Sequence, residues 1–307
     1  MRIAIMGSGG VGGYFGARLA QGGADVTFIA RGAHLAAMRE HGLTIEGARP
    51  LHLNRVNVTD DPTTVGPVDF VLFAVKLWDT ETALAQSRPL IGEKTAVISF
   101  QNGVEKESTL ARALGSAHVM GGVAYIGAEI ARPGVIRHTG ATQRLVFGEL
   151  DGRRSERGEA LQEACRRGGI DADLATDIRR EIWEKYVFLV GLSGTTAAMR
   201  SPIGAVRENP ETRAFLLDVM REVVAVGRAE GVQLADDCAE KRLAFADTLA
   251  FDMTSSMHND LRNGRPLELR WLAGGVVELG KRRGVPTPLN RSISAILALH
   301  ANGPSTA

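Results

Sequence analysis

Short apolar runs rich in β-branched residues recur through the first half of the chain and alternate with stretches of helical periodicity. These runs lie at residues 2–7, 25–30, 69–76, 95–103 and 118–127. Such alternation is typical of βαβ units and predicts a parallel, doubly wound sheet. Residues 43–60 predict a hairpin inserted after the second helix. Residues 131–149, with Pro133-Gly134 as a turn signal, predict antiparallel strands that close this domain.

The second half of the chain has a different pattern, with apolar residues spaced as on one face of a helix. Helical periodicity covers residues 177–199, 210–231, 236–257, 267–283 and 288–300. Asp177 can cap the first of these helices. We therefore predict an α/β domain over residues 1–176 and an all-helical domain over residues 177–307.

The composition narrows the class of partner. The 36 Lys and Arg residues nearly balance 35 Asp and Glu residues, for a formal charge of +1, so nothing indicates binding to nucleic acid or to an anionic membrane. The apolar start is too short for a signal peptide and no run approaches a membrane span, which favours a cytoplasmic location. Cys165 and Cys238 are too far apart for a metal or redox pair, and the histidines show no metal spacing.

A glycine-rich segment follows the first strand directly and precedes a helix. In that context one glycine makes a tight turn, one allows close approach of a phosphate, and one allows the helix to pack on the strand. Backbone N–H groups and the positive end of the helix then bind a pyrophosphate. The alternative is a simple turn. We predict a Rossmann-type dinucleotide site formed by Gly7, Ser8, Gly9, Gly10, Val11 and Gly12.

The end of the second strand indicates which dinucleotide is bound. An NAD-binding protein presents an acidic residue there to the ribose 2′-hydroxyl, whereas this chain has Ala30 and then Arg31. A guanidinium can bind a 2′-phosphate through two hydrogen bonds. Arg31 therefore favours NADPH, the alternative being a solvated arginine in a loop.

Lys76 and Asn102 follow two further strands of the predicted sheet. Ligands of open α/β sheets bind at the carboxyl ends of the strands, so both side chains are candidates for contact with cofactor or substrate. The alternatives are a loop lysine and an ordinary Asn-Gly turn.

Lys185 lies in a helix where its neighbours at three and four residues include Ile182, Phe188 and Leu189. A partly buried ammonium tends toward a lowered pKa and can donate a proton when a carbonyl is reduced. An ion pair with Glu181, four residues earlier, explains the spacing equally well.

Ser256 and Glu268 flank the interruption between two predicted helices, at Asn263-Gly264 and Pro266. From their positions alone, we expect the serine to cap a helix and the glutamate to be a negative charge in the first turn of the next helix.

The order and separation of these motifs resemble the ketopantoate reductase (2-dehydropantoate 2-reductase) family along essentially the whole chain. The segments that carry the resemblance are residues 7–35, 74–80, 99–107, 122–140, 180–186 and 255–274. The resemblance implies hydride transfer from NADPH to the 2-oxo carbon of ketopantoate, which gives pantoate on the route to coenzyme A. It also implies a small 2-oxo acid as the partner, and an apolar helical second domain is compatible with a homodimer.

The same resemblance implies roles for individual residues. The glycine turn and Arg31 would bind NADPH, Lys76 and Asn102 would border the nicotinamide, and Gly127 would contact the cofactor through its backbone. Asn102 would also contact the substrate. Lys185 would be the general acid, and Ser256 would bind the region of the substrate carboxylate. Glu268 would be the second catalytic residue and would hydrogen-bond hydroxyl groups of substrate or cofactor.

The chain departs from the family pattern at four positions. Leu189, Ser193 and Ile203 stand where the family carries substrate-binding asparagines, and Arg270 replaces an acidic residue. Each lost hydrogen-bond donor weakens the binding of a polar substrate by ~1 kcal/mol. Apolar side chains at these positions would instead accommodate a less polar substrate. Two alternatives to ketopantoate reduction therefore stand: a relative that reduces a bulkier or less polar 2-oxo acid, and a catalytically silent protein that senses NADP.

Overall fold

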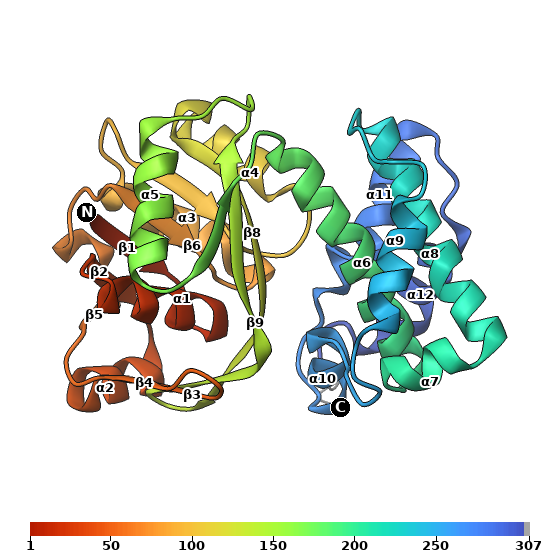
Figure 1. Ribbon diagram of the computed structural model, residues 1–307, viewed down its shortest axis with the longest axis horizontal. Helices are drawn as coiled ribbons and strands as arrows, with labels where there is room; N and C mark the ends of the chain where they lie inside the picture. The colour runs from red at the N-terminus through yellow and green to blue at the C-terminus, as the bar shows by residue number, and fades with distance from the viewer. Residues whose placement is uncertain (304–307) are drawn as a thin grey trace. The chain divides into compact units, whose positions relative to one another are not determined.

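A ten-stranded sheet organises the first of two units in the computed structural model, which describes residues 1–303. This unit comprises residues 1–101 and 105–178, and the second comprises residues 102–104 together with the chain from Arg179 onward (Figure 1). The short segment Asn102–Val104 thus groups with the helical unit although it follows a strand of the sheet.

Five parallel strands form one side of the sheet in the first unit, in the order β7-β6-β1-β2-β5, with β5 at the edge. Their bounds are β1 (Arg2–Met6), β2 (Asp25–Ile29), β5 (Asn57–Thr59), β6 (Phe70–Phe73) and β7 (Ala96–Ser99). Because β2 and β6 both pair with β1, the glycine turn after Met6 lies between the ends of two neighbouring strands.

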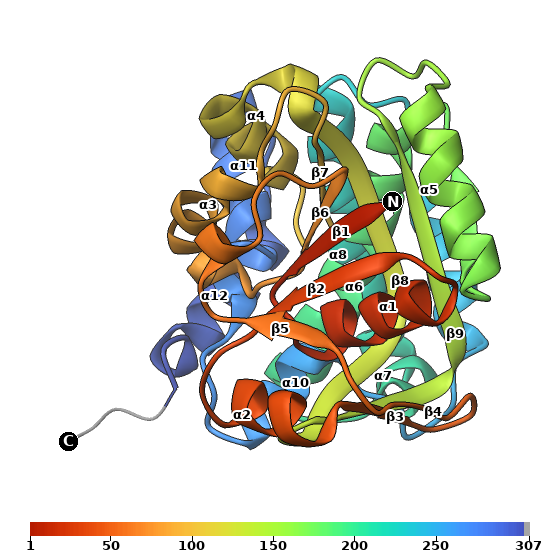
Figure 2. The same ribbon diagram turned by 90° about the vertical axis from the view of Figure 1, so that its left-hand side faces the viewer.

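Alternate residues of β1 pack on opposite faces of the sheet. Ile3 and Ile5 join a core with Tyr14 and Phe15 of α1 (Gly10–Gln21), which also includes side chains of α2 (Gly32–His41) and α5 (Glu156–Arg167). Ala4 and Met6 join a second core with side chains of α3 (Thr80–Ser87) and α4 (Lys106–Leu114). The period of two in a strand produces this division. Helices on both faces, visible in Figure 2, confirm the doubly wound sheet.

The remaining strands only partly match the predicted hairpins. The pair β3 (Leu43–Glu46) and β4 (Leu51–Leu53) is the expected hairpin, but β5 leaves it to pair with β2 at the opposite edge. The long strands β8 (Val119–Arg132) and β9 (Val135–Glu149) are antiparallel as predicted.

The expectation that these strands close the domain was wrong. β9 is an interior strand, because it also pairs in parallel with β3 near Ile136 and with β10 (Asp171–Leu174) near Val146. At 15 residues it is longer than either partner, so its two ends have room for different strands.

The second unit is helical throughout its described part, as the periodicity predicts. Its helices are α6 (Ile178–Met199), α7 (Ile203–Glu208), α8 (Pro210–Ala229), α9 (Cys238–Asp247), α10 (Ser256–Arg262), α11 (Ala273–Arg283) and α12 (Pro288–Leu297). Across residues 1–303, no helix combines the length and the apolar character needed to cross a membrane.

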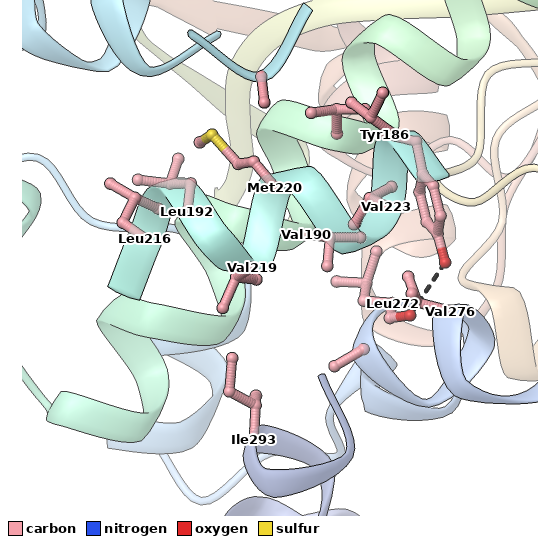
Figure 3. Packing of buried hydrophobic residues seen from close by; sticks show 14 of the residues in the cluster. Tyr186, Val190, Leu192, Leu216, Val219, Met220, Val223, Leu272, Val276 and Ile293 are labelled. Atoms are coloured by element: carbon pink, nitrogen blue, oxygen red, sulfur yellow. Dashed lines mark hydrogen bonds between the residues drawn. The ribbon is translucent and has the colours of Figure 1, made fainter. Parts of the chain in front are cut away.

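The core of this unit forms where α6, α8, α11 and α12 meet (Figure 3). Val190, Val219, Val276 and Ile293 come from these four helices and are each fully buried. Tyr186 points toward the start of α11, where its hydroxyl donates to the carbonyls of Trp271 and Leu272 at 2.9 Å. This bond fixes the segment just after Glu268 against α6.

Two of the predicted helical stretches are interrupted. Residues 236–257 form α9, then a loop, and only then the start of α10, because Ser255 caps α10 by accepting a hydrogen bond from the His258 N–H. Residues 267–283 begin with a short 3₁₀ turn, Glu268–Arg270, before α11. Helix α7 has no counterpart among the predicted stretches.

Replacing Leu216 of α8 with alanine should lower the free energy of unfolding by about 2 to 5 kcal/mol, because this side chain is fully buried and would leave a cavity. Leu299→Ala is the matched control, since Leu299 is 90% exposed and its loss should change stability by less than about 0.5 kcal/mol. Denaturant titration of both variants checks this. Equal effects would show that the core of the helical unit lies elsewhere.

Candidate active site

The turn after β1 has the geometry that a bound pyrophosphate requires. Gly7 has a φ of +98°, a conformation that residues with a side chain rarely adopt. A Cβ at Gly12 would clash with the Gly7 carbonyl, and one at Gly10 would clash with the Ala128 carbonyl. At Gly9, by contrast, a Cβ would meet nothing within 4 Å, so open space lies beside the start of α1.

These residues fit a dinucleotide phosphate. The first N–H groups of α1 have no acceptor within the helix, and the helix dipole is positive at this end. The open side of Gly9 lets a phosphate approach the backbone, while Gly7, Gly10 and Gly12 are needed for the turn and its packing. The turn can therefore hold the pyrophosphate of a dinucleotide.

Hydrogen bonds of Ser8 and His34 stabilise the glycine turn. The buried Ser8 donates from both its N–H and its hydroxyl to the Ile29 carbonyl, at 3.1 and 3.0 Å. Nε2 of His34 lies 3.0 Å from the Ser8 carbonyl, and its Nδ1 accepts the Gly134 N–H at 3.1 Å. Since Nδ1 accepts, Nε2 carries the proton and donates. Burial lowers the pKa of His34, and the hydrogen bond to Ser8 opposes that shift.

Arg31 lies just past β2, as predicted, and is the N-cap residue of α2. Its side chain is 81% exposed, and its guanidinium forms an ion pair with the Asp79 carboxylate at 2.9 Å. Asp79 ends a short 3₁₀ turn, Leu77–Asp79, that follows β6. The arginine is thus available to an anion from solution but has an internal partner.

Lys76 and Gly127 also belong to the first unit. Lys76 is exposed at the start of the 3₁₀ turn after β6, with its ammonium 5.4 Å from the centre of the Trp78 ring. Gly127 lies at an irregularity of β8, directly before Ala128, whose carbonyl touches Gly10. The backbone at Gly127 is therefore next to the glycine turn.

A chain of hydrogen bonds in the second unit joins three of the predicted site residues. The Lys185 ammonium on α6 donates to Oδ1 of Asn102 at 3.2 Å, and Nδ2 of Asn102 donates to Oε2 of Glu268 at 2.8 Å. Glu268 is buried, whereas Lys185 and Asn102 are half-buried. Residues separated by 83 and 166 positions in the sequence meet here.

The two charges at the ends of this chain determine how the Asn102 amide is oriented. Its oxygen faces the ammonium of Lys185 and its NH₂ group faces the carboxylate of Glu268. The flipped amide would place donor against donor and acceptor against acceptor. The arrangement presents a lysine proton donor beside an aligned amide and a buried carboxylate, which suits protonation of a developing alkoxide.

Ser256 lies farther along the same unit. It is the exposed first residue of α10, and the preceding Ser255 has its Oγ 3.1 Å from Oγ1 of Thr196. Thr196 is eleven residues after Lys185 on α6, or about 16 Å along the helix axis at the usual rise. Ser256 therefore does not join the hydrogen-bond chain of Lys185 directly.

The four positions that depart from the family pattern have different surroundings. Leu189 lies one turn from Lys185 and packs against the helical core, and Ile203 is fully buried in that core. Ser193 is fully buried, and its hydroxyl has no hydrogen-bond partner among the residues described. Arg270 is exposed, with its guanidinium 5.8 Å from the centre of the Trp271 ring.

Sequence reasoning missed several residues that support the first unit's ligand-binding edge. Besides Asp79 and His34, Gln101 donates to the Val75 carbonyl at 3.0 Å and to Oγ1 of Thr80 at 2.9 Å. The ammonium of buried Lys106 donates to the carbonyls of Ser99 and Gly122, at 3.1 and 2.8 Å, and pairs with Glu107. They share one signal in the sequence: each is a polar residue in the loop or first helical turn that follows a strand.

Models of one protein family match both units of the chain. The model described as "Ketopantoate reductase PanE/ApbA" matches residues 3–152. The model described as "Ketopantoate reductase PanE/ApbA C terminal" matches residues 177–301.

Individual relatives agree with these matches over almost their full length. A 2-dehydropantoate 2-reductase of Mesorhizobium japonicum is 33% identical, over 97% of this chain and 96% of its own. An uncharacterized oxidoreductase of Bacillus subtilis is 31% identical, over 98% of this chain and 99% of its own. The crystal structure of a ketopantoate reductase family protein from Ralstonia eutropha superposes with a TM-score of 0.89 at 34% identity, covering 98% of each chain.

The glycine turn and these matches first define a class, that of oxidoreductases which act on CH–OH groups and use NADH or NADPH. Within that class, the chain belongs to the ketopantoate reductase family. The predicted Rossmann-type unit followed by a helical unit is the fold of the family's solved structures.

The half-buried position of His34 makes stability depend on pH. Because its pKa in the folded chain lies below the ordinary 6.5, the unfolded chain binds more protons in acid. The stabilisation is fully present above about pH 6.5 and is lost as the pH falls below it. We expect the free energy of unfolding to fall between pH 7.5 and about pH 5, and to fall less in His34→Gln, which cannot titrate.

The matched control for this prediction is His52→Gln, which replaces an exposed histidine of β4. Denaturant titration across the pH range should give this control the wild-type slope. If His34→Gln keeps that slope too, His34 does not govern the acid response.

Proposed function

We propose that the chain reduces the 2-oxo group of a small 2-oxo acid to a 2-hydroxy group with NADPH, and that ketopantoate, which would give pantoate, is its substrate. The observation that carries the proposal is the hydrogen-bond chain from Lys185 through Asn102 to Glu268. It supports a proton donor held in a fixed position, in a chain that already belongs to a reductase family.

The first unit would hold the cofactor. The N–H groups at the start of α1 would bind its pyrophosphate, with Gly9 leaving room for close approach. The backbone near Gly127 and the side chain of Lys76 would border the rest of the dinucleotide. When bound, the nicotinamide would supply a hydride to the 2-oxo carbon.

Lys185 would complete the reduction as the general acid. As the 2-oxo carbon gains a hydride, the electron pair of its C=O bond moves to the oxygen, which becomes an alkoxide. The Lys185 ammonium gives that oxygen a proton and later regains one from solvent. Asn102 aims the ammonium and Glu268 orients Asn102, so Lys185 needs little reorganisation when charge develops. By the family resemblance Ser256 would bind the region of the substrate carboxylate, although it lies outside the hydrogen-bond chain of Lys185.

A second candidate substrate is a 2-oxo acid with a larger or less polar side chain. Leu189 favours it, because this apolar residue lies one helical turn from Lys185 and has no hydrogen bond to offer a hydroxyl group. Ser193, two turns from Lys185, keeps a hydroxyl group on this part of α6, but that hydroxyl is buried.

Loss of NADPH absorbance with ketopantoate and with a panel of bulkier 2-oxo acids tests the proposal. A kcat/KM highest for ketopantoate supports the first candidate, and one highest for an apolar 2-oxo acid supports the second. Bound NADPH without turnover of any 2-oxo acid would contradict both.

Lys185→Ala should reduce kcat by on the order of a hundredfold or more while the Kd for NADPH changes little, because the proton donor is lost and the cofactor contacts remain. Lys281→Ala, which removes an exposed lysine of α11, should keep the wild-type rate. Steady-state kinetics and a cofactor titration check both variants. An undiminished rate in Lys185→Ala would exclude it as the general acid.

Arg31→Ala should raise the KM for NADPH about tenfold or more and leave the KM for NADH nearly unchanged, since only NADPH has a 2′-phosphate for the guanidinium. Arg39→Ala is the control, because Arg39 lies on the same helix and pairs with Asp60 instead. If Arg31→Ala raises the KM for NADPH and the KM for NADH equally, Arg31 does not bind the 2′-phosphate.

A further inference from the structure

The ion pair between Arg31 and Asp79 joins the ends of two strands that are not neighbours. Arg31 follows β2 and Asp79 follows β6, and each of these strands pairs with β1 on one side. The two strands are therefore about 10 Å apart. The pair connects the loops on either side of the strand that leads into the glycine turn, so it belongs to the edge where the dinucleotide would bind.

Asp79 supplies the carboxylate that the end of β2 lacks. A dinucleotide site specific for NAD places an acidic residue near the ribose 2′-hydroxyl. Here Ala30 and Arg31 follow β2, but the Asp79 carboxylate lies 2.9 Å from the Arg31 guanidinium. The position that would receive a 2′-phosphate thus contains both a positively charged residue, Arg31, and a negatively charged one, Asp79.

The two partners differ in what they can gain from a ligand. Arg31 is 81% exposed and can turn toward an anion in solution, whereas the Asp79 side chain is 27% exposed and lies at the start of α3. A 2′-phosphate that binds Arg31 must compete with this carboxylate and then remain close to its negative charge. NADH has a 2′-hydroxyl in place of the phosphate, so it neither competes for Arg31 nor is repelled by Asp79.

We propose that Asp79 is a specificity-determining residue, which lowers the preference of this chain for NADPH over NADH by holding Arg31 and repelling the 2′-phosphate. The inference rests on the proposed function of Arg31 in binding that phosphate. It assigns to the chain a weaker discrimination between the two cofactors than Arg31 alone would give.

The test is the Kd of NADPH and of NADH, measured by isothermal titration calorimetry without substrate. Asp79→Asn keeps the size of the side chain and removes its charge. It should lower the Kd for NADPH about fivefold and change the Kd for NADH less than about twofold. The gain should shrink in concentrated salt, because the Arg31 side chain is largely exposed to solvent.

Two further variants separate the pair from general charge effects. Glu81→Gln removes an exposed charge two residues away, on the first turn of α3, and should leave the ratio of the two Kd values at its wild-type value. In a chain that already carries Arg31→Ala, Asp79→Asn should change the Kd for NADPH about twofold or less. Melting temperatures of all variants show whether each is folded.

The outcomes are distinct. An unchanged Kd ratio in folded Asp79→Asn overturns the inference, and so does weaker NADPH binding, which would mean that Asp79 holds Arg31 in its productive position. A wild-type chain that binds neither nucleotide overturns the cofactor proposal as well. Bound NADPH without reduction of any 2-oxo acid overturns the proposed reaction, while the titrations still decide the role of Asp79.

Discussion

The Asn102 amide, held between an ammonium and a carboxylate, is the interaction on which the proposed chemistry of this chain depends. Glu268 is buried, and a buried charge without partners is costly, so its hydrogen bond from Asn102 stabilises the position of both residues. The other face of the same amide accepts from Lys185. Tyr186, the next residue on α6, fixes the segment after Glu268 through the Trp271 and Leu272 carbonyls. The Lys185 ammonium is thereby held by its hydrogen bond to Asn102.

The cofactor half rests on backbone geometry instead. Gly7 supplies a conformation that other residues avoid, and the packing around Gly10 and Gly12 leaves no room for a side chain. His34 and Ser8 secure the turn through carbonyl groups, so no charged side chain is needed to build it. An ion pair lies at its border, where Arg31 meets Asp79. In the proposed site, pyrophosphate binding and the choice between NADPH and NADH would therefore depend on different residues.

Much of this organisation could be predicted, because periodicity and glycine spacing are local properties of the sequence. The parallel core and the helical second unit followed from them, whereas the family was predicted from the resemblance of the motifs along the chain. The path of β5 to the far edge and the two-sided pairing of β9 could not be predicted, since tertiary pairing decides them. The partnership of Arg31 with Asp79, 48 residues apart, was missed for the same reason. The roles assigned to Lys185, Glu268, Ser256 and the glycine turn stay predictions, although Lys185, Asn102 and Glu268 do share one hydrogen-bond chain.

The central claim is that a hydride passes from the nicotinamide to the 2-oxo carbon of a 2-oxo acid while this chain supplies the proton. NADPH that carries deuterium at both C4 positions tests it directly, with ketopantoate and an apolar 2-oxo acid as substrates and mass spectrometry with NMR of the products. The account predicts one deuterium, at C2 of the 2-hydroxy acid, with the hydroxyl proton drawn from solvent. A 2-hydroxy acid without deuterium at C2, or no 2-hydroxy acid from any substrate, would contradict it.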